Sequence, residues 1–310
     1  MATTGASDHL KGYHHPGYAA SLAEFGAPRR LARSGGSVLV RPVSGLPYQD
    51  AMGCYPLFCC EDWSGLRSDF AELQHDLVAI SLVTDPFARC DVADLQDIFG
   101  DKVSPFKTHY VADLRRPPLE FVSEHHRTYA RQSLRAVTVE RCNEPARFLE
   151  VWVGLYDVLI GRHQLKGIKK FSRDSFSRQL SIPGAVMLRA LHDGETVSAH
   201  LWYMQGEVVH SHLAASNARG YELMASYALY WHAIETFADA ARWLNFGGGA
   251  GLDSEGTDGL TKFKKGWATH TRTAYFCGRI FDRRKYDEAA AMRGASDSGY
   301  FPAYRHGEFA

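Results

Sequence analysis

The alternation of hydrophobic and polar residues in the C-terminal half predicts three antiparallel strands in succession. Residues 186–191, 197–204 and 208–215 are apolar segments of strand length, separated by short polar turns. The first turn contains Asp193 and Gly194, a strong hairpin signal because both residues tolerate a positive φ. The pattern therefore predicts an antiparallel meander.

Helical patterns flank this meander on both sides. Asn143 and Pro145 indicate a helix start before apolar positions that continue to Leu159, and Ser172 caps a second helix that runs through Leu180. After the meander, residues 222–240 carry so wide an apolar stripe that this helix is expected to be buried. A strand over 243–246, a glycine run, a helix over 257–265 and a strand over 271–280 complete the predicted order.

The N-terminal half repeats this order more faintly, without a visible sequence repeat. It predicts helices over 16–25, 63–75 and 124–134, and strands over 29–33, 38–40, 77–83 and 136–140. Strands and helices in this order favour an α/β (α+β) fold with mixed central sheets flanked by helices. We expect an N-terminal domain over 1–140, a C-terminal domain over 141–295 and a loosely attached tail over 296–310, rich in Ser, Gly and aromatic residues.

Composition narrows the class of protein. Of 310 residues, 45% are apolar and 23% are charged, as in a folded domain, and the 35 basic and 35 acidic side chains cancel. Any nucleic-acid contact must therefore come from a local basic patch. No apolar stretch approaches the roughly 18 residues of a membrane span, and the start lacks a secretory pattern, so we expect a cytoplasmic protein.

No metal site is expected. The six cysteines fit no zinc spacing and are interpreted as reduced, mostly buried thiols. His210 and His212 share one strand face at a spacing compatible with a metal, but without a third ligand we expect a pair satisfied by hydrogen bonds. The pairs 14–15 and 125–126 are interpreted as surface histidines.

The most informative segment is the glycine run Gly247, Gly248 and Gly249 with the helix after it. Glycines at a strand end let a ligand approach main-chain NH groups, and the next helix start adds partial positive charge. Within that helix, Leu260, Phe263 and Trp267 share one face and would anchor it, which would hold the Lys264 ammonium near the glycines. Such a cation suits an oxyanion or a phosphate, although the same pattern also fits a plain turn and a solvated helix.

Residues 176–280 resemble the acetyltransferase-like (GNAT) domain of the FemABX peptidyltransferases and related BioF2-like proteins. The resemblance lies in the stretches 212–216, 230–234 and 245–249, and in Asp258-Gly-Leu260 followed by Phe263-Lys264. The N-terminal half is similar only in element order and in the stretch 50–56, and no heptads match the family's coiled-coil arm. The resemblance implies tandem GNAT-like units with the active groove beside the C-terminal one.

The resemblance also implies a reaction: transfer of an amino acid from aminoacyl-tRNA to an amine of a peptidoglycan precursor, peptide or nucleoside, without a cofactor. Lys264 would stabilise negative charge at the ester or on donor phosphate. Tyr203 and His212 are further catalytic candidates as proton carriers, with Tyr227 as another proton carrier or a core residue. The expected substrate-binding residues are Asn245, Gly247, Gly248, Gly249, Phe263, Tyr227 and Lys170.

Two alternatives remain open, an acyl-CoA N-acyltransferase and a non-catalytic binding module. Residues 216–223 carry one glycine and Glu222 where acyl-CoA enzymes have a glycine-rich pyrophosphate loop, which lowers the expectation of that donor. Basic residues around Lys170 and at 279–285 fit either a tRNA patch or a solvated surface. No pattern predicts an oligomeric state.

Overall fold

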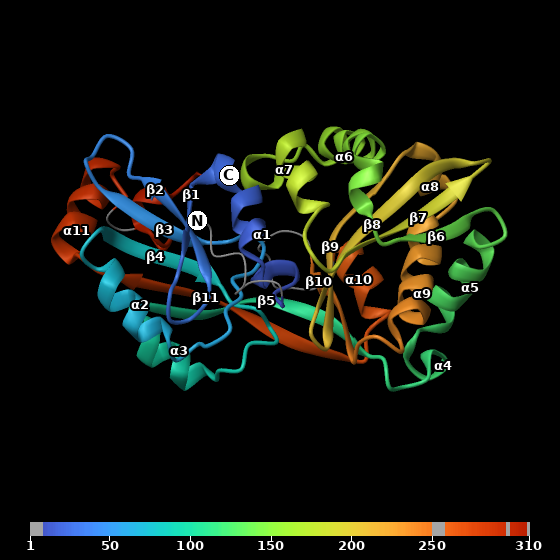
Figure 1. Ribbon diagram of the computed structural model, residues 1–310, viewed down its shortest axis with the longest axis horizontal. Coiled ribbons are helices and arrows are strands. Elements are labelled where there is room, and N and C mark those ends of the chain that lie inside the picture. Colours follow the sequence, from blue (N-terminus) through green and yellow to red (C-terminus); the bar gives the residue numbers. More distant parts are fainter. Residues whose placement is uncertain (1–8, 250–257, 296–297, 309–310) are drawn as a thin grey trace. The chain divides into compact units, whose positions relative to one another are not determined.

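The computed structural model describes residues 9–249, 258–295 and 298–308 (Figure 1). The described chain forms two compact units. Unit 1 comprises residues up to 12, 107–165 and 170–272, and unit 2 comprises 13–106, 166–169 and the residues from 273 onward. Each unit contains a mixed sheet with helices against it, so the predicted α/β class is confirmed.

The sheet of unit 1 contains the predicted meander. Its strand order is β5 (Lys102–Asp113), β10 (Trp243–Gly248), β9 (Val208–Ser216), β8 (Glu195–Gln205), β7 (Ala185–His192) and β6 (Thr138–Cys142). Only β9 and β10 are parallel, and their pairing covers 208–210 and 243–245. The hairpin turn has the predicted positive φ at Asp193 and Gly194, 52° and 83°.

The two faces of this meander are covered by different helices. Trp202 on β8 packs against Phe237 and Tyr230 of α9 (Ala225–Phe237), while the next residue, Tyr203, donates a hydrogen bond to the Gln179 carbonyl at the end of α7 (Arg173–Gln179). The remaining helical elements of unit 1 are α4 (Pro118–Phe121), α5 (Glu124–Ser133), η3 (Pro145–Phe148), α6 (Leu149–His163), α8 (Ala218–Glu222) and α10 (Gly259–Lys265).

The long helix expected over 222–240 is divided. α8 ends and α9 begins around Met224, whose φ of 53° is left-handed. Asn217 caps α8, and Gly220 lies so close to β8 that an added Cβ would be 2.2 Å from the Val197 carbonyl oxygen. This contact fixes the direction of α8 along the sheet, so the chain turns before α9.

Unit 2 repeats the topology of unit 1. Its strand order is β1 (Ala27–Arg30), β2 (Ser37–Pro42), β3 (Gln49–Gly53), β4 (Leu77–Val83) and β11 (His270–Ile280), with β3 and β4 parallel and the other pairs antiparallel. Its helices include α1 (Pro16–Ser21), α2 (Leu66–Leu73), α3 (Val92–Phe99) and α11 (Arg283–Met292). In each unit a run of antiparallel strands, four in unit 1 and three in unit 2, is followed by a parallel and then an antiparallel partner.

The final strand of each unit explains why the units differ from the domains expected with a boundary near residue 140. β5 follows β4 in the chain but pairs with β10, whereas β11 follows β10 and pairs with β4. Residues 107–140 therefore group with the C-terminal segment, and residues 273–295 group with the N-terminal one. Because each unit includes a strand from the other half of the chain, one boundary in the sequence does not separate the two units.

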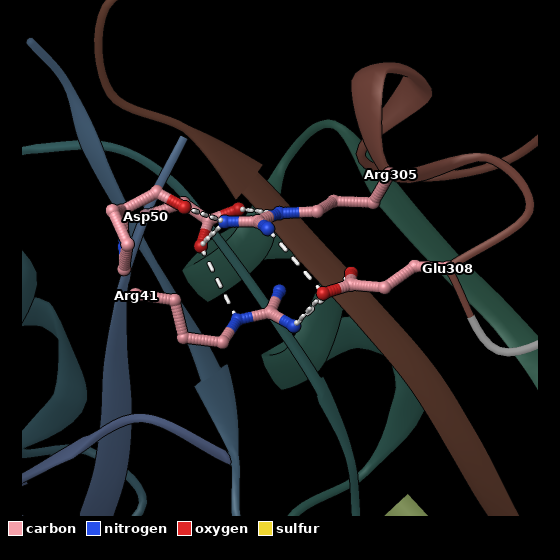
Figure 2. A network of polar contacts seen from close by, with 5 residues as sticks. Arg41, Asp50, Arg305 and Glu308 are labelled. Atoms are coloured by element: carbon pink, nitrogen blue, oxygen red, sulfur yellow. Dashed lines mark hydrogen bonds and ion pairs between the residues drawn. The ribbon is translucent and has the colours of Figure 1, made fainter. Parts of the chain in front are cut away.

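The tail expected to be loose is anchored over residues 298–308. Arg305 contacts the fully buried Asp50 at 2.9 Å, and Glu308 contacts Arg41 at 3.1 Å, in the network that Figure 2 shows. Tyr304 is buried nearby. A buried carboxylate needs such cations, so this part of the expectation is wrong.

Candidate active site

The glycine strand end of unit 1 lies directly against α10. Gly247 has a φ of +78°, and a Cβ there would be 3.2 Å from the Lys264 Nζ. A Cβ at Gly249 would be 2.2 Å from the Thr261 Oγ1. Glycine is thus required both for the backbone conformation and for the close approach of the helix.

α10 is fixed by its N-cap residue, Asp258, and by its apolar face. The Asp258 side chain accepts hydrogen bonds from the Thr261 NH (3.0 Å) and hydroxyl (2.6 Å). Phe263 and Trp267 pack into the core cluster of unit 1, as predicted. Leu260 does not anchor the helix, because 42% of it is exposed.

Lys264 lies at the strand end, where the sequence predicts it. Its half-buried Nζ donates a hydrogen bond to the Gly248 carbonyl at 2.6 Å, and no carboxylate of the described residues is within ion-pair distance. Burial, and then the positive charge of Lys107, lower the pKa of Lys264 to about 7, while Asp258 acts in the opposite direction. At neutral pH this amine is close to its midpoint of protonation.

Lys107 is a second cation that the sequence analysis missed. It lies on β5 and donates a hydrogen bond from Nζ to the Gly249 carbonyl at 3.1 Å. The lysines therefore contact main-chain carbonyl groups here, whereas the expectation was of exposed NH groups. The NH of Gly247 is itself engaged by the Asn245 Oδ1 at 2.9 Å.

Asn245 is a buried bridge between two histidines. Its side-chain Oδ1 is 3.1 Å from the His109 Nδ1, and its Nδ2 is 3.1 Å from the His210 Nδ1. With Asn245 only 2% exposed and these contacts made, it orders the end of β10. Asn245 is expected to contact substrate directly, but its buried position fits a supporting role behind the glycines.

Tyr203 and His212 come together, but deep in unit 1. Their rings stack at 4.6 Å, and both contact Gln179, the Tyr203 hydroxyl at 3.0 Å and the His212 Nε2 at 3.1 Å. Burial raises the pKa of Tyr203 well above its ordinary value. Burial, and then His210, lower the pKa of His212 to about 3. Both rings are neutral and shielded at pH 7, an arrangement that suits core packing better than proton transfer.

Tyr227 and Phe263 form the accessible side of an aromatic cluster. The partly exposed Tyr227 ring lies 4.9 Å from Phe263 and 5.2 Å from Tyr129. His126, expected at the surface, is buried beneath them with its Nε2 at 2.9 Å from the Phe263 carbonyl oxygen. His126 therefore forms part of the surface against which α10 packs, and the expectation that it is a surface residue is wrong. Lys170 is exposed, without a hydrogen bond or ion pair to the described residues.

Within the described ranges, no group of three or more His, Cys, Asp or Glu side chains is arranged to hold a metal ion. All six cysteines are free thiols. No helix among the described residues is long and apolar enough to cross a membrane.

Comparison with known proteins identifies the domain that carries this site. Residues 123–265 match the model of the acetyltransferase (GNAT) domain. No curated protein is similar enough to this chain to count as a match. The region from α5 to α10, which contains the glycine strand end and Lys264, is thus similar to a GNAT acetyltransferase domain.

Solved structures of similar fold cover most of the chain. The chain is similar to FemX, with a TM-score of 0.64, 15% identity and coverage of 91% of this chain and 96% of FemX. It is also similar to the C-terminal domain of a candidate lysylphosphatidylglycerol synthetase from Agrobacterium fabrum (TM-score 0.63, 12% identity, coverage 90% and 91%). A third is L-PGS from Bacillus licheniformis (TM-score 0.58, 15% identity, coverage 90% and 95%). The predicted FemABX-like fold is confirmed.

Proposed function

We propose that this protein transfers an aminoacyl group from aminoacyl-tRNA to an amine. The observation that carries the proposal is the Lys264 amine, which lies at the glycine strand end of a GNAT-like region without a carboxylate partner among the described residues. A cation held there against the Gly248 carbonyl is available to a developing negative charge.

The proposed chemistry makes modest demands on the protein. The acceptor amine attacks the ester carbonyl, a C–N bond forms, and the carbonyl oxygen becomes an oxyanion that protonated Lys264 stabilises. The C–O bond to the ribose then breaks, and the ribose oxygen takes the proton that the amine releases. Since the ester is already activated, positioning and charge stabilisation supply most of the acceleration. Lys107 adds a second positive charge beside the same carbonyls.

The capped helix α8 favours a tRNA ester over acyl-CoA as donor. Its Gly220 NH is engaged by the Asn217 side chain at 2.8 Å, and Glu222 adds a carboxylate that is paired with Arg219 at 2.9 Å. A pyrophosphate would have to displace the Asn217 cap and approach this acid. Two structures of similar fold have names that are consistent with aminoacyl transfer. One is a candidate lysylphosphatidylglycerol synthetase and the other is L-PGS.

The acceptor is proposed to be an amine of a peptidoglycan precursor or of a specialised peptide or nucleoside. With charged tRNA as donor, the reaction would take place in the cytoplasm. Lys170 remains a candidate contact for tRNA phosphate, whereas its neighbour Arg173 is paired with Glu150. No cofactor is required by this chemistry.

A donor screen tests the proposal. The protein is mixed with a pool of charged tRNAs and with acceptors of the three classes, and products are detected by mass spectrometry with and without ribonuclease. Ribonuclease-sensitive product supports aminoacyl transfer. Turnover of acetyl-CoA that ignores ribonuclease would establish the acyl-CoA alternative instead. Ligand binding without consumption of either donor would establish the binding module.

A further inference from the structure

Unit 2 contains a pocket at the carboxyl end of its own parallel strand pair. Beyond β3 and β4, Phe58 and Thr84 form a parallel bridge, and the NH of Asp85 donates to the Phe58 carbonyl at 3.1 Å. A pocket of about 230 Å³ opens here, lined by His14, Cys59, Cys60, Trp63, Asp85 and Phe87 among others. This topological position corresponds to the glycine strand end of unit 1, and ligands of open α/β sheets favour such strand ends.

Asp85 places a buried carboxylate in this pocket without an ion-pair partner among the described residues. The residue is 7% exposed, and its Oδ1 accepts a hydrogen bond from the Phe87 NH at 3.0 Å. Its Oδ2 contacts the Cys59 thiol at 3.6 Å, a weak donor. Asp85 forms no ion pair with any described residue, although the exposed Arg89 lies at the rim.

His14 provides a neutral acceptor beside this carboxylate. Burial lowers the pKa of His14 against the opposing influence of Asp85 and Glu61, which favours the neutral ring beside this carboxylate. Arg30, whose charge also lowers the pKa of His14, is paired with Glu61 at 3.1 Å. The His14 Nδ1 is buried and has no hydrogen-bond partner among the described residues. Depending on its tautomer, that nitrogen can accept a hydrogen bond from a ligand.

The aromatic walls of the pocket suit a cationic ligand. Trp63 and Phe87 contribute aromatic rings, which attract cations at close range. A buried carboxylate is costly unless a cation or several donors satisfy it. An anionic ligand would add to that cost, and a neutral one would leave the charge unpaired.

We propose that this pocket binds a protonated primary amine on a small molecule or at the end of a side chain, with the ammonium donating to the Asp85 Oδ2 and to the His14 Nδ1. The site is separate from the proposed transfer reaction and does not depend on it. Its volume accommodates a short alkyl or peptide-like group behind the ammonium.

Calorimetric titration of the full-length protein with n-butylammonium, n-butanol and butyrate tests the proposal, with NMR of the Trp63 indole NH locating the ligand. We expect saturable binding of n-butylammonium with a shift of the Trp63 signal. The alcohol and the carboxylate should bind at least about tenfold more weakly. Equal binding of n-butanol, or no saturable binding of the amine to the wild-type protein, would overturn the proposal.

The variant Asp85→Asn removes the charge but keeps an acceptor for the Phe87 NH. It should weaken n-butylammonium binding at least about tenfold, while Glu72→Gln on the exposed side of α2 should leave it unchanged. Unaltered affinity in a folded Asp85→Asn protein would overturn the proposal. If that variant does not fold, the comparison of amine with alcohol on the wild-type protein decides the question.

Discussion

Lys107 and Lys264 donate hydrogen bonds to consecutive carbonyl groups of one strand end, Lys264 to Gly248 at 2.6 Å and Lys107 to Gly249 at 3.1 Å. Two ammonium groups held so near to each other repel, and the pKa of Lys264 is lowered as a result of burial and of this second charge. An anion at this strand end would relieve the repulsion. The pair thus links the fold of unit 1 to the proposed chemistry.

Replacing Lys107 by Met keeps the side-chain stem that lies against Gly248 and removes the charge. The pKa of Lys264 should then rise from about 7 toward its ordinary value, because one of the two causes that lower it is gone. A ¹³C NMR titration of the Lys264 side chain measures this pKa directly. If protonated Lys264 is the active form, the fall of kcat/KM with rising pH should move upward by the same amount.

An unchanged Lys264 titration in the Lys107→Met protein would show that the two charges do not interact. The variant Lys265→Met is the matched control, since Lys265 is the exposed next residue of the same helix, and its replacement should leave the titration of Lys264 in place.

The variant Gly247→Ala tests the close approach of Lys264 to the strand end. The new methyl group would lie 3.2 Å from the Nζ and would displace it from the Gly248 carbonyl, so transfer activity should fall at least about tenfold. Gly194→Ala is the control, because Gly194 has a similar φ (+83°) with nothing within 4 Å of an added Cβ. The two variants share backbone strain, so only the first should lose activity beyond its loss of stability. Equal activity losses in both would contradict this account.

The buried network of unit 2 predicts a stability effect. Asp50→Asn leaves Arg41 and Arg305 without their shared carboxylate, and the free energy of unfolding in urea should fall by about 3 kcal/mol. Residues 298–308 should at the same time become sensitive to limited proteolysis. Asp97→Asn, which breaks only the exposed pair with Arg67, should cost less than about 1 kcal/mol. Similar losses in the two variants would mean that the network does not anchor the tail.

Local patterns predicted the parts of the fold that depend on neighbouring residues. The meander, its Asp193–Gly194 turn and the placement of Lys264 beside the glycines all follow from short segments. β5 was missed, because Pro105 interrupts its pattern and its partner β10 is distant in the chain. Lys107 was missed with it. A cation supplied by a strand pairing over such a separation leaves no local signal.

The expectations for the tail and for His126 are wrong for a related reason. Residues 298–308 are predicted to be loosely attached because their glycine and serine content resembles a linker. In the structure, Arg305 forms an ion pair with Asp50 on β3. His126 is predicted to be exposed because histidine is polar. In the structure, its ring Nε2 lies within hydrogen-bond distance of the Phe263 carbonyl oxygen. Long-range partners of single side chains decide both cases.

The most direct test of the central claim is single-turnover transfer from charged tRNA, once a donor and an acceptor are established, in the wild-type, Lys264→Met and Lys265→Met proteins. The account predicts that Lys264→Met lowers the rate about 10²- to 10³-fold and that Lys265→Met leaves it near the wild-type value. A folded Lys264→Met protein whose rate equals that of the Lys265→Met control would contradict it.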